Sequence, residues 1–230
     1  MSSPTSPEIA RRRAPEERPQ QIIDAALAVF DERGLAGARL EDIAQRAGVA
    51  KGTIYLYFPD KEELFREVVR RTLVDRLEAL GQEITAGAEA GASAAEQLRL
   101  YVERWWAFLV TPEYQAVYRL IIGELHRFPE LADFYTREVK SRVHGLVGAM
   151  IARGIASGEF RRDIDAGSAM RILGSMLMSH AMWTCRVRLL DDAPRGDQQQ
   201  LPSTLLDFFL RGMRPDTPAS GVTGGESANA

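Results

Sequence analysis

The residues best suited to chemistry lie in residues 40–58, "LEDIAQRAGVAKGTIYLYF". Lysine, hydroxyl groups and helix N-terminal amides bind phosphates, and apolar side-chain atoms contact thymine methyl groups. The outward positions of this stretch combine a cation, a residue small enough for close approach, a hydroxyl group and two phenols; they are Lys51, Gly52, Thr53, Tyr55 and Tyr57. This set predicts a surface that lies in a groove of DNA.

A different interpretation of the two phenols is that Tyr55 and Tyr57 are half-buried packing residues whose hydroxyl groups contact water. An isolated tyrosine is more often of that kind. Because these two lie beside Lys51 and Gly52, the DNA-binding interpretation is favoured.

The remaining titratable residues form no catalytic or metal-binding pattern. His126, His144 and His180 show no metal-type spacing, and Cys185 has no evident base. Glu124 and His126 are two positions apart and do not share a helix face. No Gly-rich phosphate loop is present. We therefore expect no catalytic residue, no metal and no cofactor, and a helical enzyme or small-molecule carrier is the least favoured alternative.

Composition constrains where the protein acts. A formal net charge of −3 argues against a uniformly basic surface, so DNA contact must come from a local patch. The single cysteine cannot form an intramolecular disulfide bond. No apolar run approaches the roughly 18 residues that span a bilayer, and the first residues lack the apolar core of a secretion signal. These features predict a cytoplasmic protein without a membrane partner.

Helical periodicity runs through nearly the whole chain and predicts an all-α fold. One amphipathic helix starts near Pro19 and ends before Gly34. A second short helix ends at Gly48, which can adopt the left-handed conformation, and a third runs from Lys51 to before Pro59. Packing must hold this third helix, because two turns are too short to be stable alone. The pair is a helix-turn-helix.

A longer helix starts at Asp60, which forms a capping-box pattern with Glu63. We expect it to loosen near Gly81 within the Gly- and Ala-rich stretch that follows. Further helices are predicted over residues 95–110, 112–126, 129–157, 165–190 and 201–213. The predicted organisation is a flexible arm (1–18), a three-helix unit with the helix-turn-helix (19–64), a larger helical domain (65–213), and a flexible tail (214–230).

Residues 20–65, above all "DIAQRAGVAKGTIYLYFPDKEEL", resemble the DNA-binding domain of the tetracycline-repressor (TetR) family of bacterial transcription regulators. The resemblance implies a homodimer that places one recognition helix per subunit in successive major grooves of a pseudo-palindromic double-stranded operator. It also implies that Lys51, Gly52 and Thr53 lie at bases or nearby backbone. Tyr55, Tyr57 and Lys61 would lie at phosphates or thymine methyl groups.

The chain departs from the family pattern at two caps. Ala38 and Arg39 stand where the family usually has threonine or serine, so a cap is lost, while Arg39 can contact phosphate itself. Ala50 stands where serine is frequent, at a cost of about 1 kcal/mol. The arginines at residues 11–13 can form a basic arm in the minor groove; the alternative is a solvated tail.

The larger domain is rich in aromatic and Met residues, which at helical spacing are as often simple core as pocket lining. The resemblance implies a mostly apolar small-molecule site there, which agrees with where helical bundles bind ligands. The candidate effector-binding residues are Trp105, Phe108, Tyr118, Ile122, His126, Tyr135, Met176 and His180.

The last two predicted helices carry apolar residues on more than one face, which pairing with a second subunit would cover. The candidate dimer contacts are Leu173, Leu177, Trp183, Leu205, Phe208 and Phe209. The sequence thus predicts a repressor that a small, largely apolar effector releases from DNA. A regulator that has no effector, or that activates transcription, is the alternative.

Overall fold

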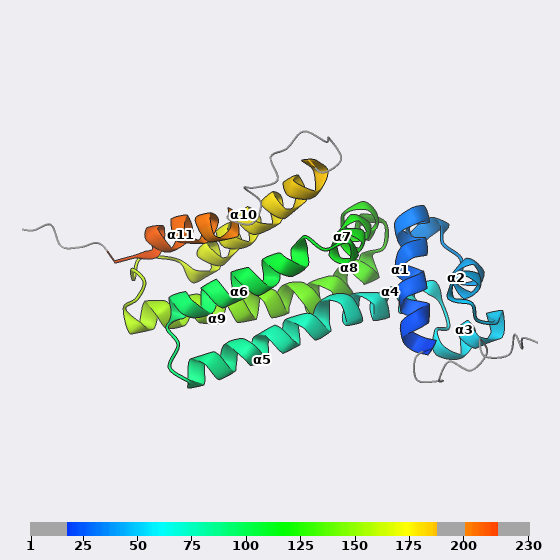
Figure 1. The fold of residues 1–230 in the computed structure, drawn as a ribbon, viewed down its shortest axis with the longest axis horizontal. Coiled ribbons are helices and arrows are strands. Elements are labelled where there is room, and N and C mark those ends of the chain that lie inside the picture. The colour runs from blue at the N-terminus through cyan, green and yellow to red at the C-terminus, as the bar shows by residue number, and fades with distance from the viewer. Residues whose placement is uncertain (1–17, 188–200, 216–230) are drawn as a thin grey trace, which may run out of the picture.

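The computed structural model describes residues 18–187 and 201–215, and within these ranges the regular structure is entirely helical (Figure 1). The predicted all-α fold is confirmed. Most of the predicted arm, including residues 11–13, and nearly all of the predicted tail lie outside the described residues.

The N-terminal unit consists of three helices around a small core. Helix α1 (Arg18–Gly37) buries Ile22, Ala26 and Phe30 along one stripe. Helix α2 (Leu40–Ala47) ends at Gly48, whose φ of 67° is left-handed and whose N–H donates to the carbonyls of the last turn. As the spacing predicted, a glycine is needed there because other residues are strained at positive φ.

Helix α3 (Lys51–Tyr57) has a single buried residue, Ile54, and no side-chain cap at Ala50. It ends at Phe58, which is buried and precedes Pro59. A helix this short gains little from its own hydrogen bonds. Its position therefore depends on Ile54 and Phe58, which anchor one side and leave the opposite side in solvent.

One continuous rod joins the N-terminal unit to the bundle. It comprises α4 (Lys61–Val69), a wider turn η3 (Arg70–Val74) and α5 (Asp75–Glu89). The Asp60 carboxylate accepts the Glu63 N–H at 2.7 Å, as the capping pattern predicted.

The expected loosening of this rod near Gly81 is wrong, because the helix continues to Glu89. A glycine costs a helix about 1 kcal/mol relative to alanine. Burial of Leu77, Leu80 and Ile84 on the same helix outweighs that cost.

The remaining helices complete the bundle. They are α6 (Ala94–Leu109), α7 (Pro112–Glu124), η4 (Leu125–Arg127), α8 (Pro129–Tyr135), η5 (Thr136–Lys140), α9 (Ser141–Ser157), α10 (Ala166–Val187) and α11 (Leu201–Met213). Pro112 and Pro129 each occupy a first helical position, as predicted. Helices α5, α6 and α9 run alongside one another, and α10 and α11 cover the side away from α5 (Figure 1). Among the described residues, no helix is both long enough and apolar enough to cross a bilayer.

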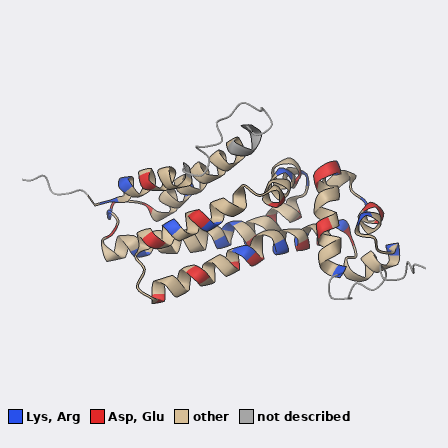
Figure 2. Ribbon diagram, in the orientation of Figure 1, with Lys and Arg blue, Asp and Glu red and all other residues tan. Residues whose placement is uncertain are grey.

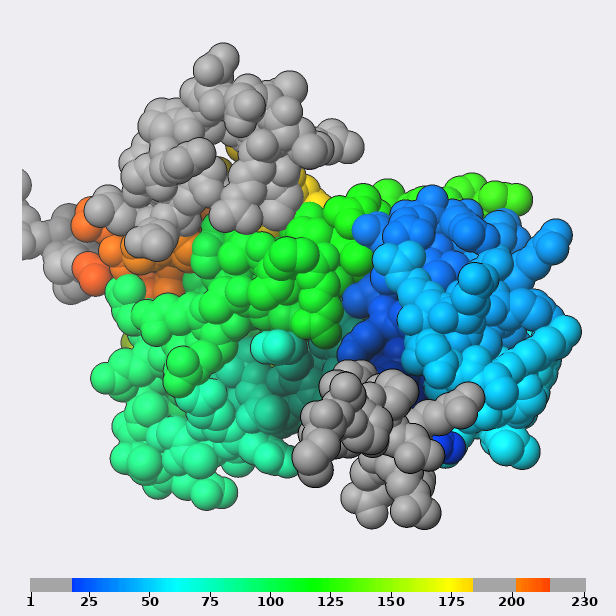
Figure 3. Space-filling model, turned by 45° about the vertical axis from the view of Figure 1, so that its right-hand side comes forward, coloured from blue at the N-terminus to red at the C-terminus, as the bar shows by residue number. Residues whose placement is uncertain are grey.

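The N-terminal unit contacts the bundle mainly through α1. The rings of Phe30 on α1 and Phe65 on α4 meet edge to face, with centroids 6.2 Å apart. Helix α1 also packs along α7, and a Cβ added at Gly34 would come within 2.6 Å of the Glu124 carboxylate. In the space-filling view the blue unit abuts the green surface of the bundle without an intervening linker (Figure 3).

Candidate DNA-binding surface and ligand cavity

Helix α3 presents its predicted outward residues to solvent. Lys51 and Gly52 are exposed, Thr53 is half-buried, and Tyr55 and Tyr57 are 44% and 41% exposed. Ile54 holds the opposite side of α3 against the core, and α3 lies at the far end of the molecule from α11 (Figure 1).

Leu56 is the most exposed large apolar residue of this surface, at 84%. It was not among the contacts predicted from the sequence. An exposed leucine has no favourable contact in water, yet it suits a thymine methyl group in the major groove.

Glu41 of α2 engages two of the candidate DNA contacts. Its Oε1 atom lies 2.7 Å from Lys51 Nζ and accepts a hydrogen bond from the Tyr55 hydroxyl at 3.1 Å. The ammonium of Lys51 also lies 5.9 Å from the centre of the Tyr55 ring. The Lys51 contact lowers the pKa of Glu41 to about 2, and the same contact raises the pKa of Lys51. A carboxylate therefore engages two groups that are predicted to contact DNA.

Lys61 and Arg39 differ in their surroundings. The Lys61 ammonium lies 3.0 Å from the carbonyl oxygen of Ala36 and 3.5 Å from that of Ala38, so it ties the start of α4 to the end of α1. Arg39 precedes α2, is exposed, and forms no ion pair with any described residue. A phosphate contact by either residue stays a prediction.

Two arginines of this unit form ion pairs with carboxylates. Arg33 lies 2.5 Å from Asp42 and Arg46 lies 2.6 Å from Glu32. Both blue and red segments occur on α1 and α2 in Figure 2. The placement of a few cations, rather than a large positive field, must therefore bring the unit onto DNA.

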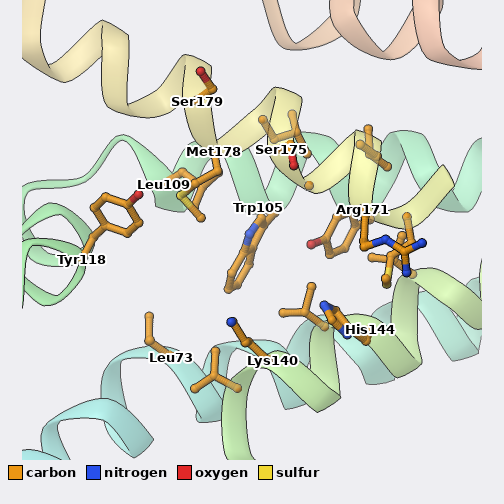
Figure 4. Close-up of a pocket in the computed structure, with 18 of the residues that line it drawn as sticks. Leu73, Trp105, Leu109, Tyr118, Lys140, His144, Arg171, Ser175, Met178 and Ser179 are labelled. Carbon is orange, nitrogen blue, oxygen red and sulfur yellow. The ribbon is translucent and has the colours of Figure 1, made fainter. Parts of the chain in front are cut away.

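A cavity of about 560 Å³ lies inside the bundle (Figure 4). Its walls come from α6, α7, α8, η5, α9 and α10, with Leu73 of the rod at one edge. This volume is within the range of small-molecule sites, which are mostly apolar with a few polar groups. The polar or charged residues of the wall include Lys140, His144, Arg171, Ser175 and Ser179.

Three of the eight predicted effector residues, Trp105, Tyr118 and Tyr135, line this cavity. Phe108 lies behind the wall, with its ring 5.4 Å from Trp105 and 5.1 Å from Tyr114. His180 instead contacts the ring of Trp106, 5.8 Å away. Ile122 and His126 are exposed on the outside of α7 and η4, and Met176 does not line the cavity.

Other wall residues were not predicted from the sequence: Tyr101, Tyr114, Lys140, His144 and Arg171. Helical periodicity identifies an inward stripe but does not separate residues that face a cavity from residues that fill the core. Burial raises the pKa of Tyr101 and of Tyr114, and that of Tyr135 to about 12, so these phenols are neutral hydrogen-bond donors.

The predicted dimer residues divide into two groups. Leu173, Leu177 and Phe209 are buried within this chain, whereas Trp183 and Phe208 are 64% and 74% exposed; Leu205 is half-buried. Ile172, 55% exposed, joins the exposed group. In Figure 2 the described parts of α10 and α11 are mostly tan, with few charged positions.

Comparisons with known proteins agree with this geometry. The family model described as "Bacterial regulatory proteins, tetR family" matches residues 22–68. The model described as "Tetracyclin repressor-like, C-terminal domain" matches residues 91–193.

Full-length relatives show the same similarity. The fatty acid metabolism regulator protein of Bacillus subtilis is 26% identical over 86% of this chain and 97% of its own. The HTH-type transcriptional regulator RutR of Escherichia coli O157:H7 is 29% identical over 89% and 94%. A structure of the transcriptional regulator FadR from Bacillus subtilis in complex with stearoyl-CoA aligns with a TM-score of 0.64, at 27% identity over 85% of this chain and 99% of that one.

Proposed function

The chain belongs to the tetR family of bacterial regulatory proteins and is a DNA-binding regulator of transcription; we propose that it is a repressor that a small, largely apolar effector releases from a pseudo-palindromic operator. The observation that carries this proposal is the joint presence of an outward α3 surface and a cavity in one chain.

The α3 surface supports contact with a major groove. Lys51, Thr53 and the two tyrosines supply phosphate ligands, and Gly52 allows the backbone close to the DNA. Leu56 adds an apolar group for thymine methyls. Arg39 and Lys61, at the starts of α2 and α4, flank this surface and are proposed as phosphate contacts.

A homodimer would present two copies of this surface. The exposed side chains of Ile172, Trp183 and Phe208 on α10 and α11 support an interface there, since large apolar groups are stabilised when a second subunit covers them. In such a dimer the two α3 helices would have to lie roughly 34–36 Å apart to reach successive major grooves.

Helix α7 links the cavity to the N-terminal unit. Tyr114 and Tyr118 on α7 line the cavity. The next residue, Arg119, pairs with Asp31 on α1. An effector that displaces α7 would thereby move α1, and Leu73 gives the rod a second, smaller contact with the cavity. The effector must bind the two conformers with different affinity, because equal binding shifts no equilibrium.

Selection of binding sites from random double-stranded DNA tests the DNA-binding part of the proposal. The expected result is an inverted repeat whose half-sites are about one helical turn apart. A single asymmetric site, or no enrichment, would contradict the dimeric operator. A reporter that carries the selected sequence across its promoter then distinguishes a repressor from an activator by the direction of the change when the protein is expressed.

A further inference from the structure

We propose that the cavity selects an amphiphile with one anionic head group, which Lys140, Arg171 and His144 bind at the cavity mouth while the uncharged body enters among the aromatic rings. This inference rests on the proposed function, because it names the chemical class of the effector.

The three cationic or imidazole groups come from both sides of the opening. Lys140 is the last residue of η5 and His144 lies one turn later on α9, so the two share a helix face. Arg171 comes from α10, a different helix that also lines the cavity. In Figure 4, Lys140 and His144 extend from the lower helix toward Trp105, and Arg171 lies on the same side of the cavity as His144.

No carboxylate balances these groups within the cavity wall, as far as the structure describes the chain. Lys140 forms no hydrogen bond or ion pair with a described residue, and Glu138 pairs instead with Arg142 at 2.6 Å. Arg171 donates to the Ser168 hydroxyl at 2.9 Å and lies 3.9 Å from Asp165, which leaves other guanidinium N–H groups available. An anion is the ligand that such a mouth favours.

The position of the charges explains why the ligand would be an amphiphile. Lys140, His144 and Arg171 are exposed, so an anionic head group bound there stays partly in water and avoids most of the cost of burying a charge. The inner wall is different: Tyr101, Trp105 and Tyr114 are at most 7% exposed.

The rings of this inner wall form a continuous layer. Tyr101 stacks on Trp105 at 6.2 Å, Trp105 meets Tyr114 edge to face at 6.4 Å, and Tyr114 stacks on Tyr118 at 6.1 Å. Burial keeps Tyr101 and Tyr114 neutral by raising their pKa values. Phenols in this state donate hydrogen bonds but balance no second charge, so the body of the ligand should be uncharged.

Matched probes test the proposal. Dodecanoate would be compared with dodecanol, and naphthaleneacetate with naphthaleneacetamide, by titration calorimetry and by quenching of tryptophan fluorescence, since Trp105 lines the cavity. Each anion is expected to bind about tenfold more tightly than its neutral partner. Dodecyl phosphate, as a further arm, distinguishes a phosphate head group from a carboxylate.

Substitutions test which residues cause the preference for anionic over neutral probes. K140A, H144A and R171A should each reduce the preference for the anionic probe, and the triple variant should bind dodecanoate and dodecanol with equal affinity. R153A is the matched control, because Arg153 is an exposed cation on α9 that does not line the cavity. Equal binding of anionic and neutral probes by the wild type, no binding of any anion, or an anion preference that survives in the triple variant would overturn the proposal.

Operator release is measured separately in the same samples. Selective binding of the anions without release from the operator would contradict the proposed effector control but support the ligand class. Release by neutral probes alone would support effector control and contradict the ligand class.

Discussion

Arg119 on α7 and Asp31 on α1 form a two-point contact, with Nε 2.8 Å from Oδ1 and Nη2 2.6 Å from Oδ2. The preceding residue, Tyr118, lines the cavity. Adjacent residues of one helix thus contact the ligand site and the first helix of the DNA-binding unit. This pair is our candidate for the connection between the two functions.

We expect D31N to weaken this connection without abolishing either function. The pair is partly exposed, so its loss should change the free energy of unfolding by about 1 kcal/mol or less. The measured quantity is the ratio of operator affinities with and without a cavity ligand. Expressed as a free energy, this ratio is the coupling between ligand and operator, which is typically about 1–3 kcal/mol in regulated proteins. In D31N the coupling free energy should fall by at least half.

R104Q is the control for D31N, because Arg104 on α6 makes a similar two-point contact with Glu83 on α5 that does not involve the N-terminal unit. If R104Q and D31N change the coupling equally, the α1–α7 connection has no special role.

We expect E41Q to bind operator DNA severalfold more tightly than the wild type. The change removes a carboxylate that engages Lys51 and Tyr55 and that would repel phosphate. Because Lys51 holds the pKa of Glu41 to about 2, the carboxylate is ionised throughout the range used for binding. The gain should therefore be constant from about pH 5 to pH 8. Fluorescence anisotropy of labelled DNA measures it; unchanged or weaker binding would mean that Glu41 positions these groups rather than competing for them.

We expect K51A to change DNA binding alone, and K61A to change both DNA binding and the free energy of unfolding. If Lys51 meets a phosphate, K51A should reduce the slope of log affinity against log salt by about 0.9 and leave the free energy of unfolding nearly unchanged. K61A should in addition lower the free energy of unfolding by about 1 kcal/mol, because its ammonium bonds the carbonyls of Ala36 and Ala38. Salt titrations and urea denaturation separate the two effects. An unchanged salt slope in either variant removes that residue from the proposed DNA contacts.

We expect Leu56 to contact a thymine methyl group. L56A should weaken binding to the selected operator by about 1 kcal/mol or more, while nonspecific binding changes little. Replacing single thymines by uracil identifies the partner, because loss of that methyl should have no further effect in L56A. I122A, which truncates an exposed aliphatic residue of α7 that belongs neither to α3 nor to the proposed dimer interface, is the control. If the loss of affinity caused by L56A adds to the loss caused by each thymine-to-uracil replacement, Leu56 contacts none of these methyl groups.

We expect F208D to disrupt the proposed dimer. Phe208 is 74% exposed in the single chain, and burying an unpaired charge at that position in an interface is strongly unfavourable. Sedimentation equilibrium at micromolar concentration should show the monomer mass, together with loss of tight operator binding. I122D alters an equally apolar residue on α7, 64% exposed, and should leave the mass unchanged. A dimeric F208D would place the interface elsewhere.

Most of the fold could be predicted from the sequence because its signals are local. Apolar periodicity indicated the helices, Gly48 indicated the turn between α2 and α3, and Asp60 with Glu63 indicated the start of the rod. The error near Gly81 has the opposite cause: a weak local preference was overcome by burial against distant helices.

The sequence predicted most of the outward positions of α3, since two anchors, Ile54 and Phe58, hold one side of a two-turn helix, but it did not predict the exposure of Leu56. It did not determine which of those side chains another helix engages. Glu41 meets Lys51 and Tyr55, and Lys61 meets the end of α1, only because the helices pack in one particular arrangement.

The cavity and the exposed apolar surface were decided only by the tertiary structure. Trp105 faces the cavity while its neighbour Trp106 meets His180, and Leu173 is buried while Ile172 is exposed. Residues with similar chemistry on one helix thus have different roles. The role of each residue depends on how several helices pack against one another. Helical periodicity describes one helix at a time and contains no information about the space between helices.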